Sequence, residues 1–182
     1  MVRSTYDKTH KLGVLNALCK VYLTVIRGTP MMVQLMIMYF VIFASSRHSV
    51  AVATLAFGIN SGAYVAEIVR GGIMSVDAGQ MEAGRSLGMN YTQTMRHIII
   101  PQAIKNILPA LGNEMITLLK DTSLMTVTGA KDLMKAAQSV TAVTYQPLMP
   151  YVSIAVIYLV CVMALSKALA VFERRLRNSD RR

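Results

Sequence analysis

The chain has 182 residues, of which 54% are hydrophobic and 15% charged, with a mean hydropathy of +0.46 and a formal net charge of +10. The apolar residues form long uncharged blocks, which is typical of an all-α, polytopic membrane protein rather than a soluble domain. The basic residues lie between these blocks, and no basic helix carries base-stacking aromatics. They indicate membrane topology and contacts with anionic lipid headgroups, and they argue against nucleic-acid binding.

Residues 1–27 predict a cytoplasmic-side amphipathic lead-in, a helix lying along the membrane surface. Its apolar residues recur at helical spacing against a basic face. They are Leu12, Leu15, Leu18, Val21, Tyr22 and Val25. Gly28-Thr29-Pro30 then ends this helix, with Pro30 suited to the first turn of the next one.

The following region, residues 28–173, predicts a transmembrane domain of about four helices. The expected spans are 28–46, 50–66, 102–128 and 151–172. Basic residues concentrate before the first span, around residues 77–101 and in the basic tail 174–182, so we expect both termini and 77–101 to be cytoplasmic. Lys131 and Lys135 fall outside and count against this rule.

Residues 77–101 form a polar insert between apolar segments, with start and stop signals of two short helices. The start signals are Asp77 with Gln80 and Asn90 with Gln93, the stop signal is Gly88, and Pro101 opens the next element. Two capped helices joined at a glycine predict a compact elbow. Such an elbow is suited to being gripped by a partner.

The segment after the elbow, 102–128, is the least hydrophobic span and carries polar residues on one broad helical face. We take the candidate pathway residues to be Asn113, Glu114, Thr117, Lys120, Asp121 and Thr122. A charge at the bilayer centre costs roughly 2.5–3.5 kcal/mol on insertion scales, so this face should look at protein or at a water-filled cavity. Two interpretations stay open: the face lines a substrate path, or Lys120 pairs with Glu114 or Asp121 and ties helices together.

No catalytic constellation stands out, and we expect no catalytic residue and no metal site. The three histidines lie far apart in sequence, and Cys19 and Cys161 have no partner at metal-ligand spacing. No glycine-rich phosphate loop with Lys-Ser/Thr is present. The serious hypotheses are therefore not enzymes.

The run Glu82-Ala83, then Gly88, then Ile100-Pro101 resembles the EAA loop in the membrane subunits of type I ATP-binding cassette importers. Gly84 stands where alanine is usual, which lowers local helix propensity. Further matches resemble the polar amino-acid permease branch. They are Arg27-Gly28-Thr29-Pro30, 67–73, Gly79-Gln80, Pro101-Gln102-Ala103 and 119–124.

This resemblance implies a permease subunit for ATP-driven uptake of a polar amino acid, multi-pass in the bacterial inner or plasma membrane. The elbow would be the coupling helix that docks on a cytoplasmic ATP-binding cassette subunit. The residues implied in coupling are Glu82, Ala83, Gly84, Gly88 and Pro101. Glu82 lies near the positive end of the first elbow helix, where a carboxylate is favoured, and Ala83 and Gly84 are expected to keep the adjoining surface small.

The resemblance also implies the partners. They are the ATPase, which would hold ATP and Mg²⁺, a second permease subunit, identical or homologous, an extracytoplasmic solute-binding protein, and membrane lipids. The family usually has five spans, with one before the segment that matches 11–27. We therefore expect this chain to be a fragment, a late start-codon choice or a naturally short subunit.

The alternative is a stand-alone channel or secondary carrier, which also places polar residues in its spans. A purely structural protein is a third hypothesis, which the polar face disfavours. The genetic neighbourhood discriminates, because an importer subunit should lie beside genes for an ATPase and a secreted binding protein.

Overall fold

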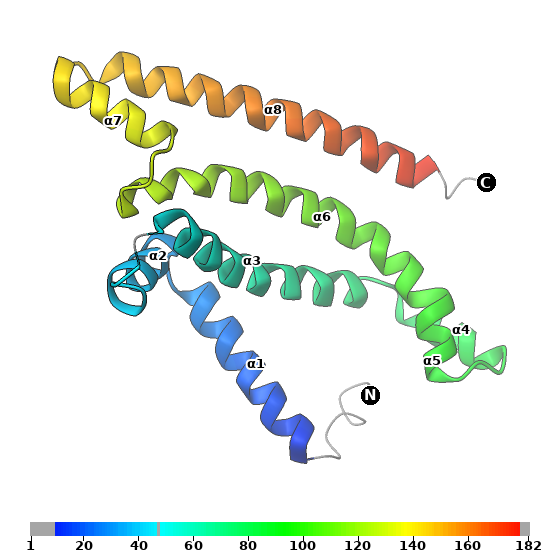
Figure 1. Ribbon diagram of the computed structural model, residues 1–182. Helices are drawn as coiled ribbons and strands as arrows, with labels where there is room; N and C mark the ends of the chain where they lie inside the picture. Colours follow the sequence, from blue (N-terminus) through cyan, green and yellow to red (C-terminus); the bar gives the residue numbers. More distant parts are fainter. Residues whose placement is uncertain (1–9, 47, 179–182) are drawn as a thin grey trace. The chain divides into compact units, whose positions relative to one another are not determined.

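The computed structural model describes residues 10–46 and 48–178, and every regular element in these ranges is helical (Figure 1). The all-α prediction is confirmed. The chain divides between Tyr64 and Val65 into two compact units, a boundary that falls inside the expected 28–173 domain. The expectations for residues 1–9 and 179–182 concern positions outside the described residues.

In the first unit, α1 (His10–Gly28) is followed by α2 (Met31–Ile37) and the π-helical turn η2 (Met38–Ile42). The chain bends by 107° between α1 and α2. Pro30 has an extended backbone (φ −63°, ψ 137°) and is the N-cap of α2 rather than part of its first turn. The break predicted at Gly28-Thr29-Pro30 is therefore present, and the next helix begins one residue later than expected.

Gln34 satisfies the backbone groups that this break exposes. Its Nε2 donates to the carbonyl of Ile26 at 2.6 Å and to Thr29 Oγ1 at 2.7 Å, and its Oε1 accepts from Nδ2 of the buried Asn60 at 3.0 Å. Buried amides and carbonyls are costly unless hydrogen-bonded, so this amide pair stabilises the bend. Neither residue was singled out from the sequence.

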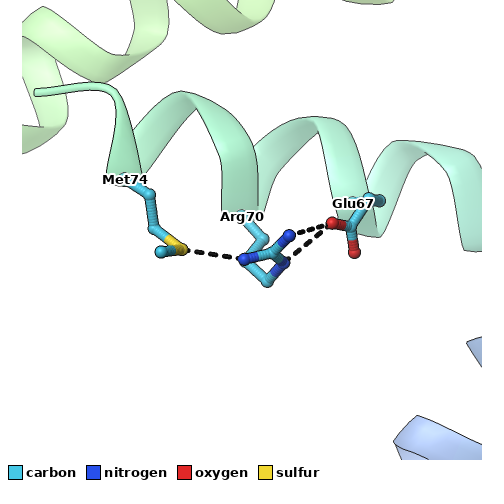
Figure 2. Close-up of polar contacts among 3 residues, drawn as sticks. All are labelled: Glu67, Arg70 and Met74. Atoms are coloured by element: carbon cyan, nitrogen blue, oxygen red, sulfur yellow. Dashed lines mark hydrogen bonds and ion pairs between the residues drawn. The ribbon is translucent and has the colours of Figure 1, made fainter. Parts of the chain in front are cut away.

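The helix α3 (Ser49–Met74) is 26 residues long and contains the expected span 50–66. It runs two turns beyond Ala66 and continues through Gly71 and Gly72 despite their low helix propensity. Glu67 and Arg70 form an ion pair just beyond the end of the expected span, and the helix continues through them (Figure 2).

The second unit holds the rest of α3 and all later elements (Figure 1). These are α4 (Ala78–Ser86), α5 (Tyr91–Thr94), the π-helical turn η3 (Met95–Ile99), α6 (Ile100–Asp121), the 3-10 helix η4 (Thr122–Thr128), α7 (Leu133–Thr144) and α8 (Leu148–Asn178). The helices α6 and α8 pack side by side, so closely that a Cβ at Gly112 would lie 2.2 Å from Leu169 Cδ1. The helix α7, which precedes α8, is capped by Asp132, whose Oδ1 accepts from Lys135 N at 2.7 Å.

In the described part of the chain, two helices are long and apolar enough to cross a membrane, α3 and residues 148–174 of α8. The bent pair of α1 and α2–η2 would make a third. The remaining expected span, 102–128, is helical throughout as α6 and η4, but its polar residues keep it out of this set. The segment Met31–Ile42 is roughly 18 Å long by helical rise, too short to cross the hydrocarbon core alone.

Candidate functional site

The first elbow helix begins where the sequence predicts. Asp77 is the N-cap of α4, and its Oδ1 accepts from the backbone amide of Gly79 at 2.6 Å. Gln80, expected to complete a capping box with Asp77, is directed elsewhere: its Oε1 accepts from Gln102 Nε2 at 3.3 Å. The side chain that was expected to cap α4 thus joins α4 to α6.

The end of α4 is a Schellman motif around Gly88, which has a φ of +76°. The amide of Met89 donates to the carbonyl of Gly84 at 3.0 Å, and the amide of Gly88 donates to the carbonyl of Arg85 at 2.9 Å. These two bonds satisfy carbonyls that a helix end otherwise leaves unpaired. The left-handed conformation at this position favours glycine, so the predicted stop at Gly88 is confirmed.

The second elbow helix begins with a complete capping box. Gln93 N donates to Asn90 Oδ1 and Asn90 N donates to Gln93 Oε1, both at 2.9 Å. Beyond this start the helix is not short, because the backbone stays right-handed helical through η3 into α6. Pro101 lies in the first turn of α6 but does not separate it from α5.

The π-helical turn at Met95–Ile99 has a local cause. Pro101 has no N–H to donate to the carbonyl four residues earlier, and its ring crowds that carbonyl, so the preceding turn widens instead of breaking. Gln102 Nε2 donates to the carbonyl of Ile98 at 3.0 Å, one residue after the carbonyl of His97 that Pro101 leaves without an amide donor. The elbow is therefore one short helix followed by a long, bulged one.

The two elbow helices meet at Gly84 and Thr94. Both residues are buried, Thr94 with 0% of its surface exposed. A Cβ at position 84 would lie 2.5 Å from Thr94 Cγ2 and 2.7 Å from Thr94 Oγ1. Sequence reasoning missed Thr94, although glycine in place of the usual alanine was a signal that another atom approaches position 84 closely.

The outer surface of the elbow carries Glu82, Ala83 and Leu87, all exposed, Leu87 with 78% of its surface. Gly84 faces inward and adds nothing to this surface, so only Ala83 keeps it small. Glu82 lies in the second turn of α4. Its backbone carbonyl accepts from Ser86 Oγ at 3.1 Å, and the residue is exposed.

The elbow is fixed to the end of α3 as well as to α6. Asn106 Nδ2 donates to Ser75 Oγ at 2.8 Å, and Ser75 Oγ donates to the carbonyl of Gly72 at 2.7 Å. At Gly72, a Cβ would lie 2.2 Å from Ile107 Cγ1. Asn106 therefore holds the end of α3 against α6 near the elbow.

The last turns of α3 carry an ion pair on one side of the helix (Figure 2). Arg70 Nε donates to Glu67 Oε1 at 2.9 Å, and Arg70 NH1 donates to the sulfur of Met74 at 2.8 Å. The Arg70 side chain is 57% exposed, so solvent screens the pair and its contribution to the stability of the fold is small. Its place at the end of a membrane-spanning helix suits the headgroup boundary.

The polar face of α6 lies at the opposite end of the helix from the elbow. Asn113, Thr117 and Lys120 are exposed, and Glu114, Asp121 and Thr122 are half-buried. Thr117 and Thr122 donate to backbone carbonyls of their own helix, Asn113 at 3.1 Å and Leu119 at 2.7 Å. No ion pair joins Lys120 to Glu114 or Asp121 in the part of the chain that the structure describes.

The candidate residues therefore fall into two groups, one in the elbow and one toward the far end of α6. Pro101 and Glu114 are 13 residues apart, which is about 20 Å along the axis. The structure brings Gly84, Gly88 and Thr94 together in the elbow. On the polar face, Lys120 interacts electrostatically with Asp121, but no hydrogen bond or ion pair joins the side chains of this face among the described residues. Among the described residues, no three His, Cys, Asp or Glu side chains gather to hold a metal ion.

A family model described as "Binding-protein-dependent transport system inner membrane component" matches residues 8–178. The chain belongs to this family. It is 41% identical over 180 residues to a putative glutamine transport system permease protein GlnP of Rickettsia bellii, covering 91% of this chain and 83% of that protein. It is 39% identical over 184 residues to the arginine transport system permease protein ArtQ of Bacillus subtilis, covering 93% and 84%.

Among solved structures, the chain resembles a subunit of an amino acid ABC transporter crystallised with histidines. The TM-score is 0.82 at 46% identity, and the match covers 93% of this chain and 78% of that one. Family, relatives and fold agree on a permease subunit in the bacterial inner membrane. The importer reading is confirmed over a stand-alone channel or carrier, and the chain is a transport subunit.

Proposed function

We propose that this permease forms half of the pathway through which an ATP-driven importer takes up a polar amino acid. The substrate class is supported by the relatives, which are named for glutamine and arginine transport, and by the polar face of α6. Carboxylates at Glu114 and Asp121 suit a substrate ammonium group, and Lys120 suits a substrate carboxylate. Asn113, Thr117 and Thr122 supply uncharged hydrogen-bonding groups beside them.

The observation that carries the proposal is the self-contained elbow. Its helix ends are capped by its own residues, Asp77 at the start of α4, Gly88 at its end and Asn90 at the start of α5, and its outer surface stays open. A rigid element with a small, exposed tip at Ala83 and Leu87 fits a groove on a cytoplasmic ATPase. Glu82 adds a carboxylate at the rim of this tip.

The remaining partners follow from what this chain leaves uncovered. Only 6% of the most apolar 18-residue stretch of α8 is buried within the chain. Lipid and a second permease subunit cover the rest. We assign ATP and Mg²⁺ to the ATPase subunit, because this sequence carries no phosphate-binding loop. An extracytoplasmic binding protein delivers the substrate, in keeping with the family description.

Coupling runs along a single helix. The helical stretch from Tyr91 to Asp121 is roughly 45 Å long and joins the elbow to the polar face without a break. When ATP binding draws two elbows together, each of these helices moves as a lever and rocks the spans between inward-open and outward-open states. We retain 28–173 as the permease domain, with the lead-in 1–27 and the tail 174–182 on the cytoplasmic side.

The test is made in vesicles reconstituted with the permease, its ATPase and its binding protein. Ala83→Glu should weaken ATPase co-purification at least about tenfold, because a buried unpaired charge in a docking groove costs several kcal/mol. Gly88→Val should abolish most of the ATP-driven uptake of substrate while the subunit still inserts into the membrane. A β-branched side chain resists the φ of +76° at this position.

Gly88→Asn is the matched control, because asparagine tolerates the left-handed region and should retain most uptake. Normal co-purification with Ala83→Glu together with normal uptake with Gly88→Val would show that the elbow is not the docking site.

A further inference from the structure

We infer that Thr94 is the positioning residue of the elbow and that Gly84 and Thr94 act as one lock that sets the direction of α4 against α5. This inference rests on the proposed docking role of the elbow and adds to it what holds the docking helix in place. Thr94 itself is fully buried, so it acts through α4 and does not touch the ATPase.

The lock is built from a missing side chain on one helix and a complete one on the other. Thr94 fills the space that a Cβ at position 84 would need, with its Cγ2 2.5 Å and its Oγ1 2.7 Å from that point. Real Cβ atoms do not approach other atoms so closely. Gly84→Ala therefore forces the two helices apart or forces Thr94 out of its place.

Thr94 has little freedom to give way. Its Oγ1 donates to the carbonyl of Asn90 at 3.0 Å, and its amide donates to the same carbonyl at 2.9 Å. Asn90 is in turn fixed by the capping box with Gln93. On the other side, the carbonyl of Gly84 accepts from Met89 in the turn that contains Gly88.

The consequence is a defined division of roles within the elbow. Glu82, Ala83 and Leu87 face outward and supply contacts, and Gly84 and Thr94 face each other and supply the angle. A change in the angle leaves the contacting residues intact but directs the motion of α4 away from the axis of α5 and α6. Such a change should reduce coupling more than it reduces binding.

The experiment compares Gly84→Ala, Thr94→Ala and the double variant Gly84→Ala/Thr94→Ala in the reconstituted complex. For Gly84→Ala we expect the Kd for the ATPase to stay within about threefold of the parent, and the amount of substrate imported per ATP hydrolysed to fall at least fivefold. The double variant should recover at least half of the lost ratio, because removing Cγ2 and Oγ1 makes room for the new methyl group and leaves only Thr94 Cβ near it, at 3.2 Å.

Two controls separate positioning from general damage. Gly71→Ala makes the same chemical change in a helix, at a glycine where a Cβ meets nothing within 4 Å, and should leave the ratio unchanged. Thr94→Val keeps the shape of the side chain and should retain more coupling than Thr94→Ala.

A normal import ratio for Gly84→Ala, or a double variant no better than Gly84→Ala alone, would overturn the lock. That failure is distinct from a failure of the docking proposal, which is read from the effect of Ala83→Glu on ATPase co-purification. If Gly84→Ala does not accumulate in the membrane, recovery of both amount and ratio in the double variant supports the lock, and absence of recovery contradicts it.

Discussion

The elbow and the polar face of α6 are joined by the long helix that starts at Tyr91, but they differ in how far their polar groups are paired within this chain. Within the elbow, both helix starts are capped by side chains, the end of α4 is closed by two backbone bonds, and Thr94 fills the space at Gly84. On the polar face, Lys120, Glu114 and Asp121 have no ion-pair partner among the described residues. The helix ends of the elbow are thus closed by its own hydrogen bonds, whereas the charged groups of the polar face lie outside any such pair among the described residues.

This difference is the one that the proposed roles of the two regions lead us to expect. An element that must transmit force is stiff by itself, because its geometry has to survive each cycle of binding and release. A surface that meets substrate or a second subunit keeps its polar groups available, since internal pairs would compete with those contacts. The two regions are about 20 Å apart along α6, so the stiff one can move the open one without touching the substrate.

The largest expected effect is all-or-none and concerns the side of the membrane on which the elbow lies. In a chain with Cys19→Ser and Cys161→Ser, Arg85→Cys and Arg177→Cys should react with an impermeant thiol reagent only after the membrane is opened. The control is Lys131→Cys, which precedes α7 on the expected outer side and should react in sealed cells. Labelling of Arg85→Cys in sealed cells would place the elbow out of reach of any cytoplasmic ATPase and would contradict its docking role.

The second prediction tests whether the polar face is open for substrate. Glu114→Gln and Asp121→Asn keep shape and remove charge, and each should raise the KM for uptake about tenfold, because a charge-assisted hydrogen bond contributes about 1.5–3 kcal/mol. The complex should still assemble, as judged by ATPase co-purification. Glu173→Gln is the matched control, because Glu173 lies near the far end of α8 and outside this face.

The opposite result has a definite meaning. Unchanged KM and unchanged selectivity in both variants would show that Glu114 and Asp121 pack against another subunit instead of lining the path. The comparison would then hold for the elbow alone.

The same contrast explains how much the sequence predicted. The helix starts at Asp77 and Asn90 and the stop at Gly88 were predictable, because a cap is decided by residues within five positions of one another. The all-helical fold and the two most apolar spans were predictable from long uncharged blocks. These features depend on local order along the chain, and a single sequence contains that information.

What was not predicted depends on contacts between distant positions. Gln34 and Asn60 are 26 residues apart, and the residues next to either one give no signal that the two side chains bond. Gln80 was expected to cap α4 and instead bonds to Gln102, which is 22 residues away. The helix through Pro101 was expected to begin there, but it is continuous from Tyr91, α4 packs against the turn Met95–Ile99, and the proline is accompanied only by a widening of that turn.

The smallest expected effect concerns Leu87, which follows α4 as its C-cap residue and is 78% exposed. A monomeric surface rarely gains from a side chain this apolar and this exposed, but a docked elbow does, because the partner removes it from water. Leu87→Ala should raise the Kd for the ATPase about fivefold, which is about 1 kcal/mol of lost burial. The intrinsic stability of the elbow should not change, since the bond from Leu87 N to the carbonyl of Ala83 belongs to the backbone.

The control is Val143→Ala, a truncation of a residue on α7 that is 80% exposed and lies outside the elbow. Titration of the ATPase onto reconstituted vesicles measures both, and equal affinities for the two variants would remove Leu87 from the docking surface while leaving the closed elbow as described.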